Sequence, residues 1–340
     1  MVDKRLILAV AGSGKTRYLI DHLNSDQRFL IVTYTNTSLN LIKSRILKKF
    51  GYYPKNIRTL TYFEFIYGFC IKPFTLFKYN LNGIYWDATP EFTTYLANNN
   101  LKKYLTKGRY LYYNRLGKFV EYENIIGNIK GRLEKFYDHF YFDEFQDLGG
   151  HDFNFITQIA QANISFLFVG DFYQNTYVTS YDGKVNGTLY SDLKEFCKKV
   201  EASNIVIDTT TLSNSYRCSP SICAFVSETL GIAIESHRND VTNIILIEDK
   251  ETAQKIIDDD SIIKLVYDKS NTRQYLSKNW GDCKGEDDYN DTCIILNKTT
   301  AKIFAKKKFN ELKPRTKNKL YVAFTRTKGN CYIIDEDLLK

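Results

Sequence analysis

A lysine and a hydroxyl residue follow two glycines near the start of the chain, in the segment AVAGSGKT (residues 9–16). Gly12 and Gly14 let the backbone curl so that its N–H groups point at an anion. Lys15 can then reach the β- and γ-phosphates of a nucleotide, and the Thr16 hydroxyl can ligate Mg²⁺. The residues expected to contact the nucleotide here are Ala11, Gly12, Ser13, Gly14, Lys15 and Thr16. A strict phosphate-binding loop has glycine at the Ala9 position, so the first glycine is missing.

An acidic run, DEFQD (residues 143–147), directly follows the apolar run HFYF (residues 139–142). A carboxylate at the carboxyl end of a strand can meet Mg²⁺ beside a phosphate-binding loop. We therefore expect Asp143 to be the second Mg²⁺ ligand and Glu144 to be the base that orients and deprotonates the attacking water. An acidic surface turn is the simpler interpretation, but it does not explain why the acids follow an apolar strand.

The elements around these residues alternate between strand and helix. Short apolar runs end just before the phosphate-binding loop and before Thr33, and helical patterns follow both of them. This rhythm predicts an open, mostly parallel sheet wrapped by helices. It breaks over residues 74–130 and then resumes. The expected strands are residues 5–10, 29–32, 139–142, 164–169, 205–212, 242–246, 262–266, 292–296 and 330–334; the expected helices are 15–23, 38–50, 153–162 and 317–327.

AGSGKT with a later DEFQD resembles the UvrD/Rep-type superfamily 1 helicases, in which alanine at the Ala9 position is also common. Other segments match and stand in the family's order. TYTN (residues 33–36) resembles TxTN, and GDFYQNTY (residues 170–177) resembles GDxxQxxY. SYR (residues 215–217) resembles NYR, and LYVAFTR (residues 320–326) resembles LYVAxTR. The matches extend over nearly the whole chain.

The resemblance implies an α/β fold with two RecA-like, parallel-sheet lobes and a small, mostly helical insertion in the first. The expected limits are 1–73 and 131–203 for the first lobe, 74–130 for the insertion and 204–340 for the second lobe. The family's large accessory insertion in the second lobe would fall between Arg217 and Lys284, where too few residues remain for it. We therefore expect a compact form that lacks large accessory domains.

The resemblance also implies roles for residues around the phosphates. Gln146 and Gln174 would sense the γ-phosphate and its water. Arg217 and Arg326 would reach from the second lobe and neutralise charge on the transferring phosphoryl group. Both would act only when the cleft closes, which would couple hydrolysis to lobe motion. Taken alone, Arg326 would be a helix-surface cation.

Further residues match positions that bind the base and the nucleic-acid strand in this family. Arg17 and Tyr216 would sandwich the adenine, since a guanidinium and an aromatic ring both stack on a flat base. Tyr34 and Tyr177 would stack on bases of a single strand, with Asn36 beside them. As isolated residues these tyrosines would be core or rim residues. The residues expected to contact the strand are Tyr34, Asn36 and Tyr177.

The sequence departs from the family in several places. No glutamine precedes the phosphate-binding loop to read adenine, so the preference for ATP over other nucleotides stays open. WGDCKGED (residues 280–287) resembles the family's SKGLE loosely: Lys284 and Gly285 match, and Asp287 stands at the glutamate position, which assigns it to the nucleotide site. Ser215 replaces the usual asparagine.

The segment LKKYLTKGRYLYYNRLGKF (residues 101–119) mixes basic residues with tyrosines. Such a mixture suits a flap that contacts a nucleic-acid strand. A plain solvated helical hairpin explains it equally well. The basic residues concerned are Lys102, Lys103, Lys107, Arg109, Arg115 and Lys118.

Composition is that of a globular protein with a mild basic excess. The net charge is +8, from 47 basic and 39 acidic residues. This balance fits a polyanionic partner, and it also fits a solvated basic surface. The seven cysteines have irregular spacings, which favours reduced thiols in a cytoplasmic protein. The sequence has neither a signal peptide nor an apolar run long enough to span a membrane.

Together these features predict an ATP- and Mg²⁺-dependent helicase or single-strand translocase with 3′-to-5′ polarity. Its partner would be single-stranded DNA, with RNA as the alternative strand. A nucleotide-gated binding or regulatory subunit, acting with a nuclease or replication partner, is the second hypothesis. A small-molecule kinase would share the phosphate-binding loop, but this hypothesis does not explain the later motifs.

Overall fold

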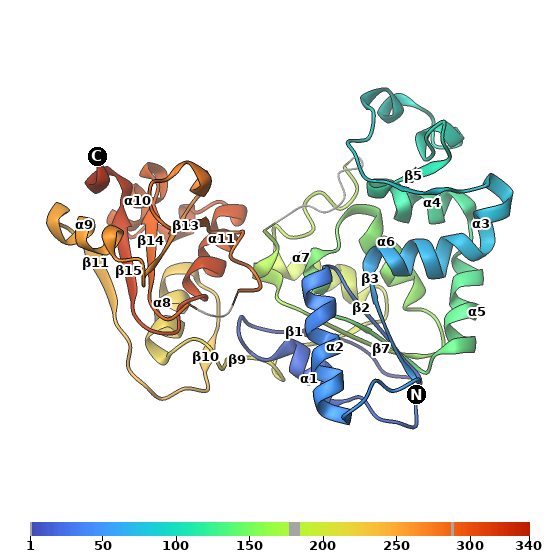
Figure 1. Ribbon diagram of the computed structural model, residues 1–340, viewed down its shortest axis with the longest axis horizontal. Coiled ribbons are helices and arrows are strands. Elements are labelled where there is room, and N and C mark those ends of the chain that lie inside the picture. The colour runs from blue at the N-terminus through green and yellow to red at the C-terminus, as the bar shows by residue number, and fades with distance from the viewer. Residues whose placement is uncertain (1, 177–183, 287–288) are drawn as a thin grey trace. The chain divides into compact units, whose positions relative to one another are not determined.

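The structure is a computed structural model that describes residues 2–176, 184–286 and 289–340. It contains two compact units (Figure 1). The first holds Met1–Ile7, Lys15–Gly170 and Val178–Asp208, and the second holds Leu8–Gly14, Asp171–Tyr177 and Thr209–Lys340. The second unit therefore includes the first part of the phosphate-binding loop, up to Gly14, and the residues DFYQ that follow Gly170. The lobe limits expected from the sequence stay a prediction.

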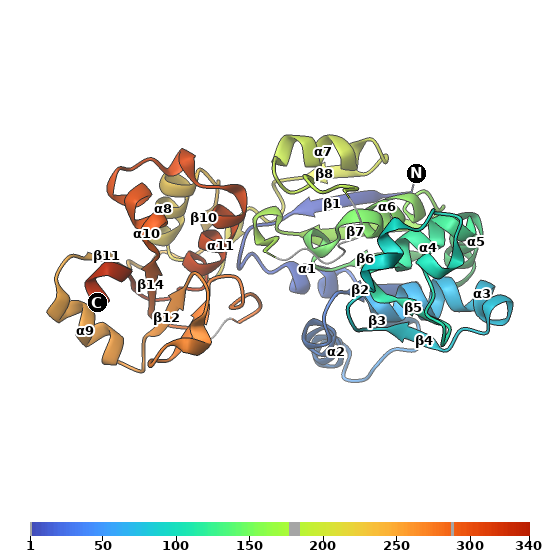
Figure 2. The same cartoon turned by 90° about the horizontal axis from the view of Figure 1, so that it is seen from above.

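The first unit is built on a six-stranded sheet with the order β3-β2-β6-β7-β1-β8. Figure 2 shows the strands side by side in this sequence, from β8 to β3. The described pairings are parallel, as when Ile31 pairs with Thr59 on one side and with Tyr141 on the other. Every residue of β2 is buried, because helices cover both faces of such a sheet. The strands are β1 (Lys4–Leu8), β2 (Phe29–Thr33), β3 (Ile57–Thr61), β6 (His139–Phe142), β7 (Ser165–Gly170) and β8 (Val206–Asp208).

Helix α2 of this unit begins and ends at recognisable signals. Thr35 caps α2 by accepting a hydrogen bond from the Ser38 N–H at 3.1 Å. Gly51 ends the same helix in the left-handed region, at φ +76°. The helices are α1 (Lys15–Asp21), α2 (Asn36–Phe50), α3 (Lys72–Tyr79), α4 (Leu116–Glu123), α5 (Ile126–Phe136), α6 (Gly150–Ile159) and α7 (Leu193–Glu201), and a π-helical segment (Glu64–Ile71) precedes α3.

The insertion is helical at both ends and contains a parallel strand pair that the sequence did not predict. This pair joins β4 (Gly83–Tyr85) to β5 (Tyr110–Tyr112). Strands of three residues are too short to show an alternating pattern, so periodicity could not reveal them. Three-residue to five-residue 3₁₀ turns fill the segment between them and after them, at Glu91–Tyr95, Leu101–Lys103 and Tyr113–Arg115.

The second unit is built on a five-stranded parallel sheet with the order β11-β15-β14-β12-β13. A separate parallel pair joins β9 (Asn214–Ser215) to β10 (Glu235–Ser236). The sheet confirms the predicted α/β fold of two parallel-sheet lobes. Its strands are β11 (Ile244–Ile247), β12 (Ile263–Val266), β13 (Ser277–Asn279), β14 (Thr292–Leu296) and β15 (Cys331–Asp335); the helices are α8 (Pro220–Leu230), α9 (Lys250–Asp258), α10 (Lys298–Ala305) and α11 (Pro314–Phe324).

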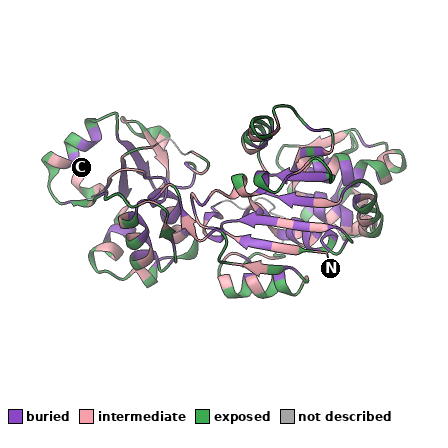
Figure 3. Ribbon diagram, turned by 90° about the horizontal axis from the view of Figure 1, so that it is seen from below, coloured by how far each residue is buried: buried purple, intermediate pink, exposed green. Residues whose placement is uncertain are grey.

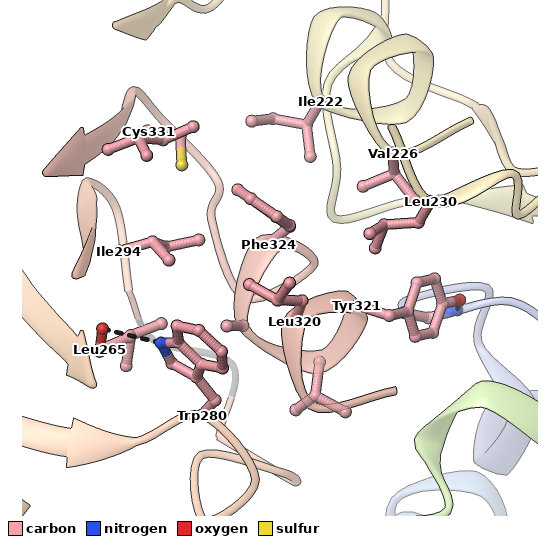
Figure 4. Packing of buried hydrophobic residues seen from close by; sticks show 14 of the residues in the cluster. Ile222, Val226, Leu230, Leu265, Trp280, Ile294, Leu320, Tyr321, Phe324 and Cys331 are labelled. Carbon is pink, nitrogen blue, oxygen red and sulfur yellow. Dashed lines mark hydrogen bonds between the residues drawn. The ribbon is translucent and has the colours of Figure 1, made fainter. Parts of the chain in front are cut away.

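Apolar side chains form one cluster on each face of the second sheet. Figure 3 colours its central strands as mostly buried. On one face, Leu320 and Phe324 of α11 pack near Ile294 and Trp280 (Figure 4). The Trp280 ring is fully buried, and its Nε1–H donates to the Leu265 carbonyl at 2.9 Å. A buried indole needs such a partner, so the ring is fixed as well as buried. Helix α11 is thereby held firmly on the sheet.

Several element limits differ from those expected. Helix α11 begins at Pro314, earlier than the expected 317, because proline is well suited to the first helical turn. The expected strand 205–212 is shortened to β8, and a loop leads from it to β9. All seven cysteines are free thiols. Among the residues that the structure describes, no helix has the combined length and hydrophobicity that crossing a bilayer requires.

Candidate nucleotide site and nucleic-acid interface

In the first unit, the end of the phosphate-binding loop lies beside the acidic run. Lys15 and Thr16 open helix α1, and Asp143 directly follows strand β6. The Thr16 hydroxyl donates to the Asp143 Oδ2 atom at 2.9 Å. Parallel strands end at the same edge of a sheet, which is why residues so distant in sequence meet. Hydroxyl and carboxylate oxygens are the ligands that Mg²⁺ prefers, so this pair fits the predicted metal site.

Asp143 is almost completely buried, with 1 % of its surface exposed. Burial, together with the negative charge of Glu144 beside it, raises the pKa of the Asp143 carboxyl to about 6. The Lys15 ammonium and the Thr16 hydroxyl act in the opposite direction and favour the carboxylate. Removing a carboxylate from water is costly unless positive charge compensates it. The site is therefore suited to a cation.

Glu144 has a left-handed backbone, at φ +61°. This conformation is uncommon for a residue with a side chain and is typical of functional sites. The Gln146 side-chain amide donates to Glu144 Oε2 at 2.5 Å. A Cβ atom added to Gly170 would lie 2.7 Å from Gln146 Oε1, so only glycine leaves room for this glutamine. The two predicted residues, Glu144 and Gln146, thus lie together.

In the second unit, the first half of the phosphate-binding loop packs against the SYR turn. Gly12 has φ +72° and Gly14 has φ +88°, which are conformations that glycine permits. The Gly12 carbonyl accepts from the Tyr216 N–H at 2.9 Å. A Cβ atom added to Gly12 would lie 2.7 Å from both Arg217 Cβ and Ser215 Oγ. Both the backbone conformation and the close approach therefore require glycine at position 12.

Ser215 stands where the NYR pattern has asparagine, and its side chain closes the turn before Arg217. Its hydroxyl oxygen accepts from the backbone N–H groups of Arg217 at 3.2 Å and Cys218 at 3.0 Å. A serine hydroxyl can close a turn in this way, as an asparagine side chain does. The substitution therefore keeps the local geometry that presents Arg217.

The two arginines are held by backbone carbonyls of the second unit. Arg217 Nη1 donates to the Thr325 carbonyl at 3.1 Å, and Arg326 Nη1 donates to the Glu286 carbonyl at 3.1 Å. Arg326 has 2 % of its surface exposed, so it is not a helix-surface cation. A guanidinium is always charged, and burying a charge costs free energy. A buried arginine is therefore a candidate for a functional role.

Gln174 ends a 3₁₀ turn, Phe172–Gln174, and is buried. Asp171 caps this turn, because its Oδ1 accepts from the Tyr173 N–H at 3.1 Å. The Asp171 Oδ2 atom accepts from the hydroxyl of Tyr321, a residue to which the sequence assigned no role. The sequence carried no specific signal for this contact, because Tyr321 stands in the apolar run LYVAF, as a core residue would.

The two predicted base-stacking residues are both accessible. Arg17 pairs with Asp21 at 3.5 Å and keeps 77 % of its side chain exposed. Tyr216 is 60 % exposed, and its ring stacks on His237 with centroids 4.0 Å apart. One face of Tyr216 is therefore covered by an imidazole that the sequence did not single out.

Tyr34 belongs to a row of aromatic rings in the first unit. It stacks on Tyr62 at 5.7 Å and meets Phe63 edge-on at 5.7 Å. Phe63 contacts Trp86 at 4.8 Å, and Trp86 is 58 % exposed. Trp86 also stacks on Tyr113. Asn36 begins helix α2 after this row. Of the other predicted contacts, Tyr177 and Asp287 lie outside the described residues.

The six basic residues singled out in the insertion differ in burial, and Lys118 is intermediate. Lys103 and Arg115 are buried, and their side chains donate to backbone carbonyls of the insertion itself, those of Leu96 and Lys103. The expectation of a strand-contacting flap, or of a solvated hairpin, is therefore wrong for these two side chains. Both satisfy carbonyls that irregular backbone leaves without partners. Lys102, Lys107 and Arg109 are exposed.

Comparison with known proteins finds likeness in structure alone. No protein-family model matches the sequence, and no curated protein matches it. The structure is similar to that of arterivirus nonstructural protein 10, a helicase solved in complex with DNA, with a TM-score of 0.51 and 12 % identity over 99 % of this chain and 63 % of that chain. The PRRSV helicase follows with a TM-score of 0.48, 12 % identity, and 98 % and 52 % coverage.

This similarity shows the α/β fold with parallel sheets, and the fold alone. The chain spans less than two thirds of the length of the arterivirus protein. At such low identity, a shared fold does not carry a shared reaction, because one fold hosts many functions.

Proposed function

We propose that the chain is an ATP hydrolase of the UvrD/Rep type that works as a DNA helicase or single-strand translocase. The observation that carries this proposal is the 2.9 Å hydrogen bond between Thr16 and Asp143. It joins the hydroxyl of a phosphate-binding loop to a buried carboxylate, which is the ligand pair that a nucleotide-bound Mg²⁺ requires. Thr16 and Asp143 would hold this ion, which neutralises charge on the phosphates when bound.

Glu144 is the base in this proposal. It follows Asp143 directly and has the uncommon backbone conformation described above. The Gln146 amide fixes one of its carboxylate oxygens, so that the carboxylate can orient a water molecule and accept its proton. Lys15, which adjoins Thr16, would hold the phosphates.

Arg217 and Arg326 would stabilise the transferring phosphoryl group in the nucleotide-bound state. The backbone around Arg217 lies against Gly12, and Gly12 is only three residues before Lys15 in the chain. Arginines of this kind raise the rate by about 10³ to 10⁵ in related NTPases. We expect their engagement to couple hydrolysis to a change in grip on the strand.

The strand would bind along the aromatic row of the first unit. Tyr34 and Trp86 offer flat ring surfaces, which bind bases without regard to sequence. The exposed lysines of the insertion and the net charge of +8 suit a phosphate backbone. The 3′-to-5′ polarity is proposed from the family resemblance, and DNA is proposed over RNA.

The test is ATP turnover measured without polymer and with single-stranded DNA, duplex DNA and RNA. We expect single-stranded DNA to stimulate turnover most strongly. Lys15→Ala and Glu144→Gln should each lower the stimulated rate by about 10² to 10⁴. Exposed positions serve as controls: Lys48→Ala and Glu201→Gln make the same chemical changes and should leave the rate unaltered.

Two results would overturn this proposal. One is full stimulated turnover in Glu144→Gln, because the base would then lie elsewhere. The other is the absence of any turnover in the unaltered chain. Turnover without strand displacement or translocation would instead favour the nucleotide-gated regulatory subunit, and strand-displacement assays with and without a nuclease or replication partner separate the two functions.

A further inference from the structure

The Tyr321 hydroxyl connects segments that are far apart in the chain. Tyr321 lies in helix α11, is completely buried, and points away from Trp280 and Ile294 (Figure 4). Its oxygen accepts from the Ala11 backbone N–H at 2.9 Å, and its hydroxyl hydrogen is donated to Asp171 Oδ2 at 3.0 Å. One buried group therefore joins the phosphate-binding loop to the turn that carries Gln174.

Both of these contacts bear on residues of the nucleotide site. Asp171 caps the Phe172–Gln174 turn, and the Gln174 N–H donates to the Asp171 carbonyl at 2.9 Å. Because the Asp171 carboxylate is bonded on one side to Tyr173 and on the other to Tyr321, the turn is fixed to helix α11. A hydrogen bond to a buried carboxylate is stronger than one between neutral groups.

Helix α11 makes a further contact with the segment that follows the Gln174 turn. The Asn318 side-chain amide donates to the Asn175 carbonyl at 3.1 Å, just after the Gln174 turn. The carbonyl of Thr325, which follows the helix, accepts from Arg217. Residues three and four positions apart share one face of a helix, so Asn318 and Tyr321 form a single contact surface. Helix α11 thus positions the loop, the turn and the arginine together.

We infer that Tyr321 is a positioning residue that holds Gln174 in fixed register with the phosphate-binding loop. The inference rests on the proposed function. It states how the contacts of the Tyr321 hydroxyl affect the rate of ATP hydrolysis. The Ala11 N–H is engaged by Tyr321, so it is not among the N–H groups that bind phosphate in this arrangement. Loss of the hydroxyl therefore removes no phosphate-binding donor, but it frees the Ala11 N–H and loosens the Gln174 turn. It should lower kcat more than it raises the KM for ATP.

The test is Tyr321→Phe, which removes the hydroxyl and keeps the ring in the core. We expect kcat to fall by about tenfold to a hundredfold and the KM for ATP to change by less than about threefold. Tyr104→Phe is the matched control, because Tyr104 is equally buried and its hydroxyl donates to the Asn98 carbonyl at 2.8 Å within the insertion. Polymer-free turnover of the control should equal that of the unaltered chain.

Two further measurements separate positioning from general loosening. Hydrogen exchange of the peptide around Ala11 should become faster in Tyr321→Phe and stay unchanged in Tyr104→Phe, and this measurement needs no turnover. In a double-mutant cycle, adding Tyr321→Phe to Gln174→Ala should lower kcat little further, because the tyrosine acts through that glutamine. Additive losses would overturn the inference.

The inference would also be overturned if Tyr321→Phe had the same kcat as the original sequence. The proposed function would still stand in that case, because the original sequence would hydrolyse ATP. A third result would overturn the inference: Tyr321→Phe and Tyr104→Phe could lower both kcat and the thermal midpoint to the same extent. The loss would then be a general effect of core packing. Absence of turnover in the unaltered chain would overturn the proposed function and this inference with it.

Discussion

The hydroxyl of Thr16 lies 2.9 Å from Asp143 Oδ2, although 127 positions separate these residues in the chain. The contact exists because β1 and β6 are parallel strands of one sheet and end at the same edge. A buried carboxylate beside a hydroxyl and near a lysine is an arrangement that a cation would stabilise.

Asp143→Asn should lower ATP turnover on the order of a hundredfold or more, because an amide is a weaker metal ligand than a carboxylate. The Mg²⁺ concentration needed for half-maximal turnover should rise. Turnover across a Mg²⁺ titration measures both effects. Asp268→Asn, at an exposed position, is the control. An unchanged Mg²⁺ requirement in Asp143→Asn would assign the ion to other ligands.

Gly12→Ala should abolish nucleotide binding. The new Cβ atom would lie 2.7 Å from Arg217 Cβ, in a backbone conformation that also strains alanine by about 1–3 kcal/mol. Gly51→Ala separates these causes, because Gly51 has a similar φ of +76° but no atom within 4 Å of the added Cβ. Gly51→Ala should lower the thermal midpoint and keep nucleotide affinity. Equal affinities in the two variants would contradict the close approach.

The stability of the protein should depend on pH through Asp152. Burial raises the pKa of this carboxyl to about 7, with the Tyr62 hydroxyl and His151 opposing the rise. Its ordinary pKa of 3.8 applies in the unfolded chain. The folded state thus binds the proton more tightly, and the free energy of unfolding should fall by about 4 kcal/mol as pH rises from about 4 to about 7.

Denaturant unfolding at several pH values measures this dependence. Asp152→Asn should remove most of the slope, because the amide does not ionise, and it should be the more stable protein above pH 7. Asp260→Asn, at an exposed site, should keep the slope of the unaltered chain. A slope that persists in Asp152→Asn would show that another group controls it.

Substitutions of two neighbouring lysines in the insertion should affect different properties, one stability and the other DNA binding. Lys103→Ala should destabilise the protein by about 1–3 kcal/mol, since its buried Nζ donates to the Leu96 carbonyl at 2.6 Å. Lys102→Ala should leave stability within about 0.5 kcal/mol. It should instead weaken DNA binding and reduce the salt dependence of the affinity by about one phosphate contact. Thermal melts and binding at several salt concentrations distinguish the two.

Local signals were sufficient for most strands of the two sheets, whereas strand β3 and helices α7, α8, α9 and α10 were not predicted. The alternation of apolar strands and helical patterns predicted both parallel sheets, because burial on both faces leaves an uninterrupted apolar run such as Phe29–Thr33. The phosphate-binding loop and the acid run after Phe142 were visible because each combines rare residue types at fixed spacing. The short strands β4, β5 and β13 escaped, since three residues carry no period.

What the sequence determined by itself is the set of groups that can do chemistry: a loop for phosphate, a carboxylate pair and two arginines at the ends of distant motifs. Only the tertiary structure decided which of them meet. Tyr321 looks like one more core residue in the sequence, and Lys103 looks like its solvated neighbour Lys102. The partners of Tyr321 are the Ala11 N–H and the Asp171 carboxylate, and the partner of Lys103 is the Leu96 carbonyl. Backbone groups recur at nearly every residue and Asp171 is far away in the chain, so no local pattern could have announced these contacts.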